Sequence, residues 1–142
     1  MGGSSKRYVL DTSVLVKWFV TEEDSDKAER FLNDLSDEKI EIVIPVTLLY
    51  ELANVLWVRR LQGLSQAEAL SILKDFRRLN LEVVSSLELV EEAQAFAYRY
   101  NISIYDAVFL ALSESRSCEF ITADEKLYRK VSLSWVKLLK SI

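Results

Sequence analysis

Short hydrophobic runs alternate along the chain with longer segments in which hydrophobic residues recur every three or four positions. Five runs predict buried β-strands, the last of them only a candidate: residues 7–10, 41–44, 81–84, 119–122 and 134–136. Six amphipathic segments predict helices: residues 13–20, 24–35, 46–61, 65–78, 86–100 and 104–115. Because strands alternate with helices, we expect an α/β fold with a doubly wound sheet of four to five mostly parallel strands and helices on both faces.

Individual residues mark where several of these elements begin and end. Pro45 closes the second strand and can occupy the first turn of the next helix. Gly63 ends that helix, and Ser65 followed by Glu68 has the spacing of a capping box for the next one. Ser103 is a candidate cap for the helix that follows it. The helix boundaries are therefore predicted from specific side-chain chemistry as well as from periodicity.

Periodicity also predicts which helical positions face the core. The expected inward residues of three helices are Ala28, Phe31, Leu32 and Leu35; Leu48, Leu49, Leu52, Val55 and Leu56; and Leu89, Val90, Ala93, Phe96 and Ala97.

The chain of 142 residues has the length and composition of one globular domain, which we assign to residues 6–142. Residues 1–5, Met-Gly-Gly-Ser-Ser, resemble a flexible leader or a cloning remnant and are left out of the fold. No hydrophobic run approaches the roughly 20 residues that a membrane helix needs, so no membrane association is expected.

The cysteine and histidine content limits both the cellular compartment and the catalytic mechanisms that fit this chain. Cys118 is the only cysteine, which rules out an intrachain disulfide and favours a reducing, cytoplasmic location. Histidine is absent, which removes Ser/His and Cys/His nucleophilic sites, almost every zinc site and the usual general base of metal-independent ribonucleases. Any catalysis must therefore depend on carboxylates, hydroxyls, lysine, arginine or a metal ion.

A formal net charge of -4 weighs against a nucleic-acid partner, since such domains are usually basic. Locally the sequence is more positive. Three basic groups are either positive patches or ordinary solvated helix faces: Arg59 with Arg60, Arg77 with Arg78, and Lys126 with Arg129 and Lys130.

Four acidic residues stand where a strand should end or a helix should begin. Asp11 and Asp124 directly follow predicted strands, Glu51 lies in the first turns of a hydrophobic helix, and Asp106 lies in the first turn of another. Since the carboxyl ends of strands in a doubly wound sheet meet at one edge, we expect all four to converge there. A lone carboxylate in hydrophobic surroundings costs several kcal/mol to desolvate, so positive charge is expected among them.

A hard divalent cation is the obvious source of that charge. Two unpaired carboxylates about 4 Å apart repel by roughly 4 kcal/mol at an effective dielectric constant near 20. Ligands that are all oxygen, with no histidine or cysteine among them, favour Mg²⁺, with Mn²⁺ able to substitute, over Zn²⁺. Such a site can orient a phosphodiester, activate water and stabilise the leaving oxygen, which points to phosphoryl chemistry.

Three of the acids also have a local explanation. Asp11 could cap the following helix, a role that Thr12 or Ser13 could share, and Asp124 could cap a last short helix. Asp106 could serve only as the charge that favours a helix N-terminus. The glutamate is harder to explain locally because hydrophobic residues surround it, and the four together are less easily accidental than any one.

The ordered set of motifs resembles the PIN domain, and most closely the VapC-type toxins of prokaryotic toxin–antitoxin pairs. The residues that carry the resemblance are Val9-Leu10-Asp11-Thr12-Ser13-Val14-Leu15, Glu51, Tyr105-Asp106-Ala107 and Ile121-Thr122-Ala123-Asp124. The resemblance extends from about residue 7 to residue 136, and none of the four acids departs from the family pattern.

The resemblance implies a metal-dependent ribonuclease, usually a homodimer, held inactive by a small VapB-like antitoxin. It further implies that Asp11, Glu51, Asp106 and Asp124 are catalytic and bind the metal. Ser13 and Thr122 would support them with hydrogen bonds within the acidic cluster. Metal-activated water would attack phosphorus, and both the resemblance and the missing histidines favour products with 5′-phosphate and 3′-hydroxyl ends.

Other enzyme classes fit the sequence less well. Phosphatases of the haloacid dehalogenase type also begin with an aspartate after a strand, but they need a second aspartate where this chain has Ser13. A topoisomerase–primase site needs Asp-x-Asp after a strand. Residues 24–26 have that spacing, but they open a solvated helix.

Two further alternatives share the fold. In one, the chain is a catalytically weak module that binds a partner in a hydrophobic groove formed by Trp18, Phe19, Trp57, Leu61 and Leu64, residues that could equally be ordinary core. In the other, it is a nuclease that processes RNA without an antitoxin.

Overall fold

A computed structural model describes residues 6–142, and the predicted leader at residues 1–5 lies outside the described residues. The strands are β1 (Lys6–Leu10), β2 (Ile40–Pro45), β3 (Glu82–Val84), β4 (Glu119–Thr122) and β5 (Val136–Leu138). The α-helices are α1 (Thr12–Leu15), α2 (Ser25–Ser36), α3 (Thr47–Val58), α4 (Gln66–Arg77), α5 (Val90–Tyr100), α6 (Ile104–Arg116) and α7 (Glu125–Val131). Short 3₁₀ turns are η1 (Val16–Trp18), η2 (Arg59–Gln62), η3 (Ser86–Leu89) and η4 (Leu139–Ser141).

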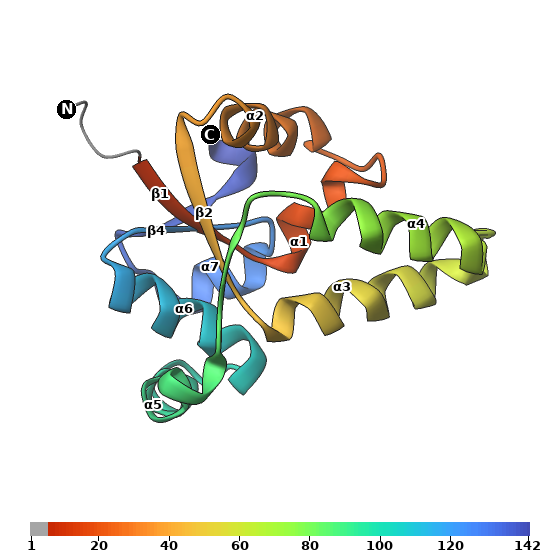
Figure 1. Cartoon of the computed structure of the whole chain (residues 1–142). Coiled ribbons are helices and arrows are strands. Elements are labelled where there is room, and N and C mark those ends of the chain that lie inside the picture. The colour runs from red at the N-terminus through yellow and green to blue at the C-terminus, as the bar shows by residue number, and fades with distance from the viewer. Residues whose placement is uncertain (1–5) are drawn as a thin grey trace.

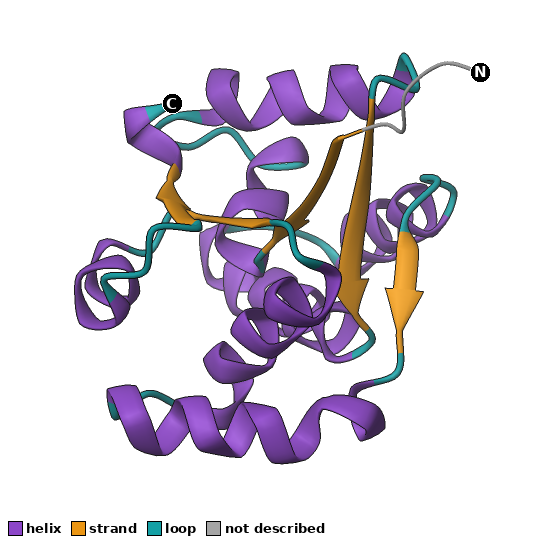
Figure 2. Ribbon diagram, turned by 90° about the vertical axis from the view of Figure 1, so that its left-hand side faces the viewer, coloured by secondary structure: helices purple, strands orange, loops and turns teal. Residues whose placement is uncertain are grey.

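The strands form a single parallel sheet in the order β3-β2-β1-β4-β5, which confirms the predicted doubly wound architecture. The chain moves outward from β1 to β2 and β3, then crosses back to β4 and β5. Since such crossovers are right-handed, this reversal puts the two sets of helices on opposite faces. Figure 1 shows α2 on one side of the strands and α5 and α6 on the other, and Figure 2 shows the strands enclosed by helices.

The strand order reverses between β1 and β4. These two strands pair directly, with Val9 opposite Phe120 and Leu10 opposite Ile121. The ladder continues one residue further, where the backbone N–H of Asp11 donates to the carbonyl of Ile121 at 3.3 Å. The carboxyl edge at this point is where ligands bind in open α/β sheets.

Helix α6 is the central helix of the molecule and packs against β1, β2 and β4. Seven consecutive residues, from position 107 to position 113, are buried in it. Ser103 caps the helix, accepting a hydrogen bond from the backbone N–H of Asp106 at 3.1 Å. Since a helix packed on a parallel sheet runs antiparallel to the strands, the first turn of α6 lies at their carboxyl edge.

Helices α3 and α4 pack side by side and project from the sheet (Figure 1). The turn between them follows the predicted signals. Gly63 has a left-handed φ of 95°, and Ser65 and Glu68 form the complete capping box. Among the described residues, no helix is both long and hydrophobic enough to cross a membrane.

Four details of the sequence prediction were wrong. The helix predicted at residues 13–20 is only the short α1 followed by the 3₁₀ turn η1. Pro45 is the last residue of β2 and does not lie in the first turn of a helix. The fifth strand lies two residues later than predicted, at Val136–Leu138. Val90, expected in the core, is 47% exposed. The tighter turn of η3 precedes it, and this offsets the helix face from a uniform 3.6-residue period.

Candidate active site

The loop after β1 and the loop after β4 are joined through Asp11. This aspartate caps α1, and its Oδ1 atom accepts hydrogen bonds from the Ser13 hydroxyl and from the backbone N–H of Val14, the latter at 3.3 Å. Its Oδ2 atom accepts a hydrogen bond from the Thr122 hydroxyl at 2.5 Å. Asp11 is only 7% exposed. Its carboxylate is therefore both buried and held by three donors at the switch point of the sheet.

The two hydroxyls also accept hydrogen bonds and so lock the second loop. The Ser13 Oγ atom accepts from the backbone N–H of Ala123 at 3.0 Å, and the Thr122 Oγ1 atom accepts from the backbone N–H of Asp124 at 3.0 Å. Asp124 in turn caps α7, accepting from the backbone N–H of Leu127 at 3.1 Å. These hydrogen bonds therefore fix the backbone positions of Asp11 and Asp124 at the carboxyl ends of β1 and β4.

The other two acids enter from helices. Glu51 lies in the second turn of α3, the helix that follows β2, and Asp106 lies in the first turn of α6. Neither makes an ion pair, and no side chain within residues 6–142 is recorded as a hydrogen-bond partner of the Glu51 Oε1 atom, which is buried. This oxygen retains unused capacity to accept a hydrogen bond or bind a cation, and the Thr12 hydroxyl is the one nearby donor that lowers the pKa of the Glu51 carboxyl among the described residues.

Electrostatics shows that these acids affect one another. Burial raises the pKa of Asp11 to about 6, against the lowering effect of its hydrogen bonds from Ser13, Thr122 and Val14. Burial, together with the charges of Asp106 and Asp11, raises the pKa of Glu51 to about 7, against the lowering effect of the nearby Thr12 hydroxyl.

Asp106 is under the same influence. Burial and the charge of Asp124 raise its pKa, whereas the Ser103 hydrogen bond and the charge of Lys130 lower it. The raised pKa values of Asp11, Glu51 and Asp106 show that full ionisation of these three acids is unfavourable, as expected of a site that takes up positive charge.

The donor set fits a hard divalent cation. It consists of carboxylate and hydroxyl oxygens, and it includes the unpartnered Glu51 oxygen. Within the described part of the chain, no three acidic, cysteine or histidine side chains already surround a single point. Ion binding would therefore require some of these side chains to change rotamer.

Two grooves flank this acidic edge. The first, of about 660 Å³, lies between α3 and the start of α6 and includes Glu51 and Asp106 in its wall. The second, of about 300 Å³, lies between the start of α6 and α7 and includes Asp106, Asp124 and Lys130.

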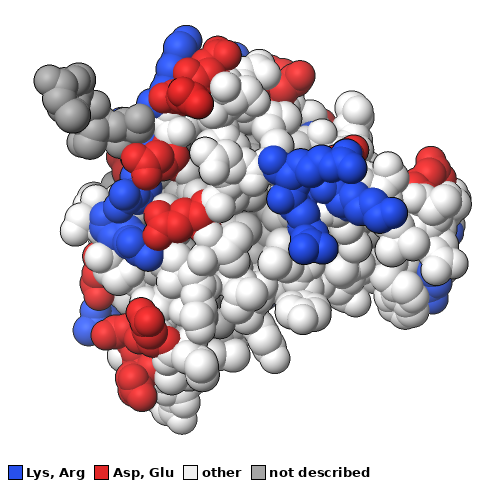
Figure 3. Space-filling model, viewed as in Figure 1, with Lys and Arg blue, Asp and Glu red and all other residues white. Residues whose placement is uncertain are grey.

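Only one of the three predicted basic groups borders the acids. Lys126 and Lys130 line the second groove. Arg59 is instead paired with Glu22, and Arg60 stacks 3.6 Å from the ring centre of Trp57. Arg77 and Arg78, at the end of α4, line neither groove, and Arg78 lies 3.5 Å from Asp75. Figure 3 shows a group of basic side chains over the region of α4.

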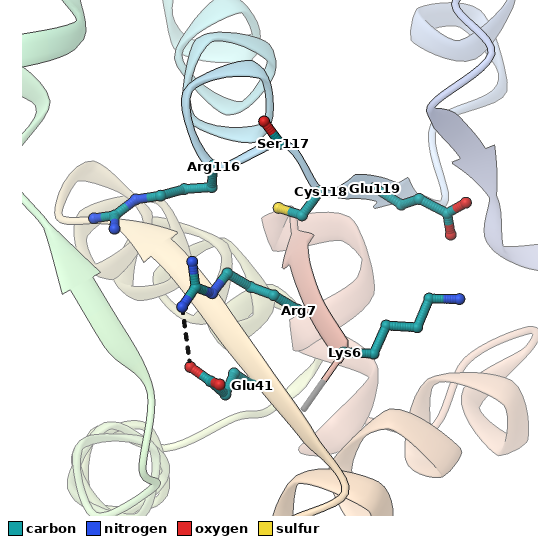
Figure 4. A pocket seen from close by; sticks show the side chains of 7 residues that line it. All are labelled: Lys6, Arg7, Glu41, Arg116, Ser117, Cys118 and Glu119. Atoms are coloured by element: carbon teal, nitrogen blue, oxygen red, sulfur yellow. Dashed lines mark hydrogen bonds and ion pairs between the residues drawn. The ribbon is translucent and has the colours of Figure 1, made fainter. Parts of the chain in front are cut away.

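A further hollow, of about 370 Å³, lies at the opposite edge of the sheet, where β1 and β4 begin (Figure 4). It contains Lys6, Cys118 and Glu119, but its arginines are already paired. Arg7 lies 3.3 Å from Glu41, and Arg116 lies 2.8 Å from Glu82. The charges there are balanced, unlike those at the carboxyl edge.

Comparison with known proteins identifies the family of this chain. The model of the PIN domain family matches residues 8–132. Ribonuclease VapC3 of Pyrobaculum aerophilum is 31% identical over 127 residues, which cover 87% of this chain and 94% of that protein.

Solved structures share the fold. The crystal structure of PAE2754 from Pyrobaculum aerophilum has a TM-score of 0.72 at 20% identity, covering 97% of this chain and 88% of that one. VapBC2 from Rickettsia felis, solved bound to a DNA fragment from its promoter, has a TM-score of 0.65 at 18% identity, covering 92% and 96%. With a PIN model matched over most of its length and a VapC relative above 30% identity, this chain belongs to the PIN-domain family.

Proposed function

We propose that this chain is a divalent-metal-dependent endoribonuclease, and the toxin of a type II toxin–antitoxin pair. The observation that supports the proposal is that Glu51 and Asp106 line one groove, Asp106 and Asp124 line the next, and burial with mutual charge raises the pKa values of Asp11, Glu51 and Asp106. The identity to Ribonuclease VapC3 supports the same activity. We expect it to act in the cytoplasm, where its RNA substrate is found.

In this proposal the four carboxylates hold Mg²⁺, or Mn²⁺ in its place. The bound ion supplies an activated water and stabilises the negative charge that develops on the leaving oxygen. Asp11 is the anchor of the site, because three hydrogen bonds fix it. Ser13 and Thr122 keep its oxygens oriented, and Glu51 contributes the oxygen that has no other partner.

The proposed partners are a VapB-like antitoxin and a second copy of the chain. Relatives of similar fold have been solved as toxin–antitoxin complexes, among them one from Klebsiella pneumoniae. Of the residues predicted to form a hydrophobic groove, Trp57 and Leu61 are 58% and 73% exposed, whereas Trp18, Phe19 and Leu64 pack against the core. The exposed pair lies at the end of α3 and in η2, and remains available to a partner.

The test is cleavage of end-labelled RNA with Mg²⁺, with Mn²⁺ and with EDTA, using the wild type, Asp11→Asn and Asp106→Asn. We expect cleavage with either metal, loss of at least about 100-fold in each variant, and none in EDTA. Asp75→Asn is a matched control, because Asp75 is an exposed α4 aspartate that lines neither groove. It should cut like the wild type.

The ends of the products test the chemistry. Attack by water on phosphorus, with cleavage of the bond between phosphorus and the 3′ oxygen, leaves 5′-phosphate and 3′-hydroxyl ends. Undiminished cleavage in EDTA, or 2′,3′-cyclic phosphate products, would contradict the proposal, because the cyclic route uses the ribose hydroxyl as the nucleophile.

A further inference from the structure

The groove between α3 and α6 presents one face of α3 to the acidic edge. Thr47, Tyr50, Glu51, Asn54 and Val55 all line it, and their spacing puts them on a single helical face. Ser103, Tyr105 and Asp106 line the opposite side from the start of α6. Since Glu51 and Asp106 belong to the proposed metal site, whatever occupies this groove lies beside the scissile phosphate.

Two tyrosine rings stand on opposite sides of the groove and are largely exposed. Tyr50 is 78% exposed and Tyr105 is 61% exposed, and neither belongs to the hydrophobic core. Exposed aromatic rings beside a nuclease site can stack on nucleobases, and a stacked base contributes substantially to binding. The aliphatic side chain of Val55 adds a hydrophobic surface between hydrogen-bonding groups.

Those hydrogen-bonding groups suit the edge of a base. The Asn54 side chain is exposed and carries both a donor and an acceptor. An amide of this kind can pair with a complementary donor and acceptor on the edge of a base.

The groove on the other side of the acids has the opposite character. Lys126 and Lys130 line it, and the Lys130 ammonium group donates to the carbonyl of Asn101 at 2.9 Å. Ser103 and Asp106 line both grooves, so the two meet at the first turn of α6. One side is therefore suited to phosphate and the other to a base.

We infer that the α3–α6 groove binds one unpaired base of the RNA, stacked on Tyr50 and Tyr105, while the backbone continues past Lys126 and Lys130. This inference rests on the proposed function and names the positioning residues for its substrate. Asn54 then reads the edge of the bound base and influences which nucleotide is preferred beside the cut. The base must leave any duplex to enter, so paired RNA is a poor substrate.

The inference is tested by kinetics with Tyr50→Ala and Tyr105→Ala on a short unpaired RNA. Loss of a stacked base should raise KM about 5- to 100-fold and leave kcat nearly unchanged, because stacking binds ground and transition states alike. Tyr50→Phe and Tyr105→Phe keep the ring and should behave like the wild type. Tyr98→Ala is the matched control, an 81% exposed tyrosine of α5 that lines neither groove.

A substrate change gives an independent readout. An oligonucleotide with one abasic position beside the cut should lose affinity for the wild type but lose little for the double variant that lacks both rings. An abasic penalty that is equal in wild type and double variant would overturn the inference and leave the ribonuclease intact. So would unchanged KM in both alanine variants, or a defect confined to self-association in sedimentation runs.

Binding without cleavage separates this inference from the proposed function. The Asp11→Asn chain with Mg²⁺ should quench a 2-aminopurine base at the same position, and the added ring deletions should abolish the quench. If the wild type cuts no RNA but the quench depends on both rings, the proposed function fails and the base site stands. Thermal unfolding midpoints of all variants must stay near the wild type for this comparison.

Discussion

A single aspartate can both cap a helix and place its carboxylate in the proposed active site. Asp11 caps α1 and Asp124 caps α7, as their places after strands predict. The same hydrogen bonds that cap the helices hold the carboxylates at the edge of the sheet. Capping is therefore the means by which the backbone orients these two acids, and it does not compete with a role in the site.

Thr122 is the residue on which this orientation depends most. It is fully buried, donates to Asp11 and accepts from the Asp124 backbone. We expect Thr122→Val, which preserves shape, to reduce cleavage by at least about 10-fold and to destabilise the fold by about 1–3 kcal/mol. The Thr122 hydrogen bond lowers the pKa of Asp11. Its loss should therefore raise that pKa and shift the acidic limb of the pH–rate profile to higher pH.

Thr122→Ser keeps the hydroxyl and is the control for this substitution. It should retain both the activity and the pH profile of the wild type. A valine variant whose activity falls only in proportion to its loss of folded protein would show that Thr122 acts on stability alone.

At the scale of elements, α6 and α7 bring the charges of the site together. The N-terminus of α6 favours the Asp106 carboxylate through its exposed N–H groups and dipole, and Ser103 fixes the first turn. The short helix α7 carries Asp124 at its cap and Lys126 and Lys130 on the side facing the second groove. Negative and positive charge thus alternate along the proposed RNA path.

Salt dependence tests the role of α7. Lys126→Gln should reduce the slope of log KM against log salt concentration by about 0.7, the value for one phosphate contact on a single strand, and should leave kcat unchanged. Lys74→Gln, an exposed lysine in the last turn of α4, should leave the slope as it is. An equal slope change in both variants would show a general effect of net charge.

Elements with strong local signals were predicted well, and those without them less well. The helix from Gln66 to Arg77 has its capping box, and the helix from Ile104 has its serine cap, and both begin where predicted. The fifth strand has only three residues, and sheet pairing defines it more than its sequence does. Val90 was misplaced because periodicity cannot detect a 3₁₀ turn in front of a helix.

At the scale of the whole molecule, the site has a stability cost that pH and metal should reveal. Acids whose folded pKa is raised bind more protons in the folded state than in the unfolded state, so stability falls as pH rises through that interval. For Asp11 and Glu51 the interval runs from about 4 to about 7. In EDTA, the free energy of unfolding should therefore decrease over this range and level off above it.

At pH 8, the loss of stability caused by the ionised buried acids should be reduced by Mg²⁺ and, separately, by the Asp11→Asn substitution. Mg²⁺ raises the unfolding midpoint by binding only the folded chain. Asp11→Asn removes a buried charge whose penalty is on the order of 2–3 kcal/mol, so in EDTA it should be more stable than the wild type although inactive. Thermal melts with EDTA and with Mg²⁺ measure both effects, and a variant less stable than the wild type in EDTA would show that its hydrogen bonds matter more than its burial.

The sequence by itself determined the alternation of strands and helices and the helix caps, because these depend on local periodicity and on side chains that bond to their own backbone; the four acids it selects remain the proposed site. It also excluded histidine-based chemistry, since composition needs no structure. The tertiary structure decided which of the basic groups borders the acids, that Trp18 and Phe19 pack against the core while Trp57 and Leu61 are exposed, and that two tyrosines flank a groove beside the site. These are contacts between segments as far apart as Asp11 and Thr122, 111 residues along the chain, and only the order of strands in the sheet brings them together.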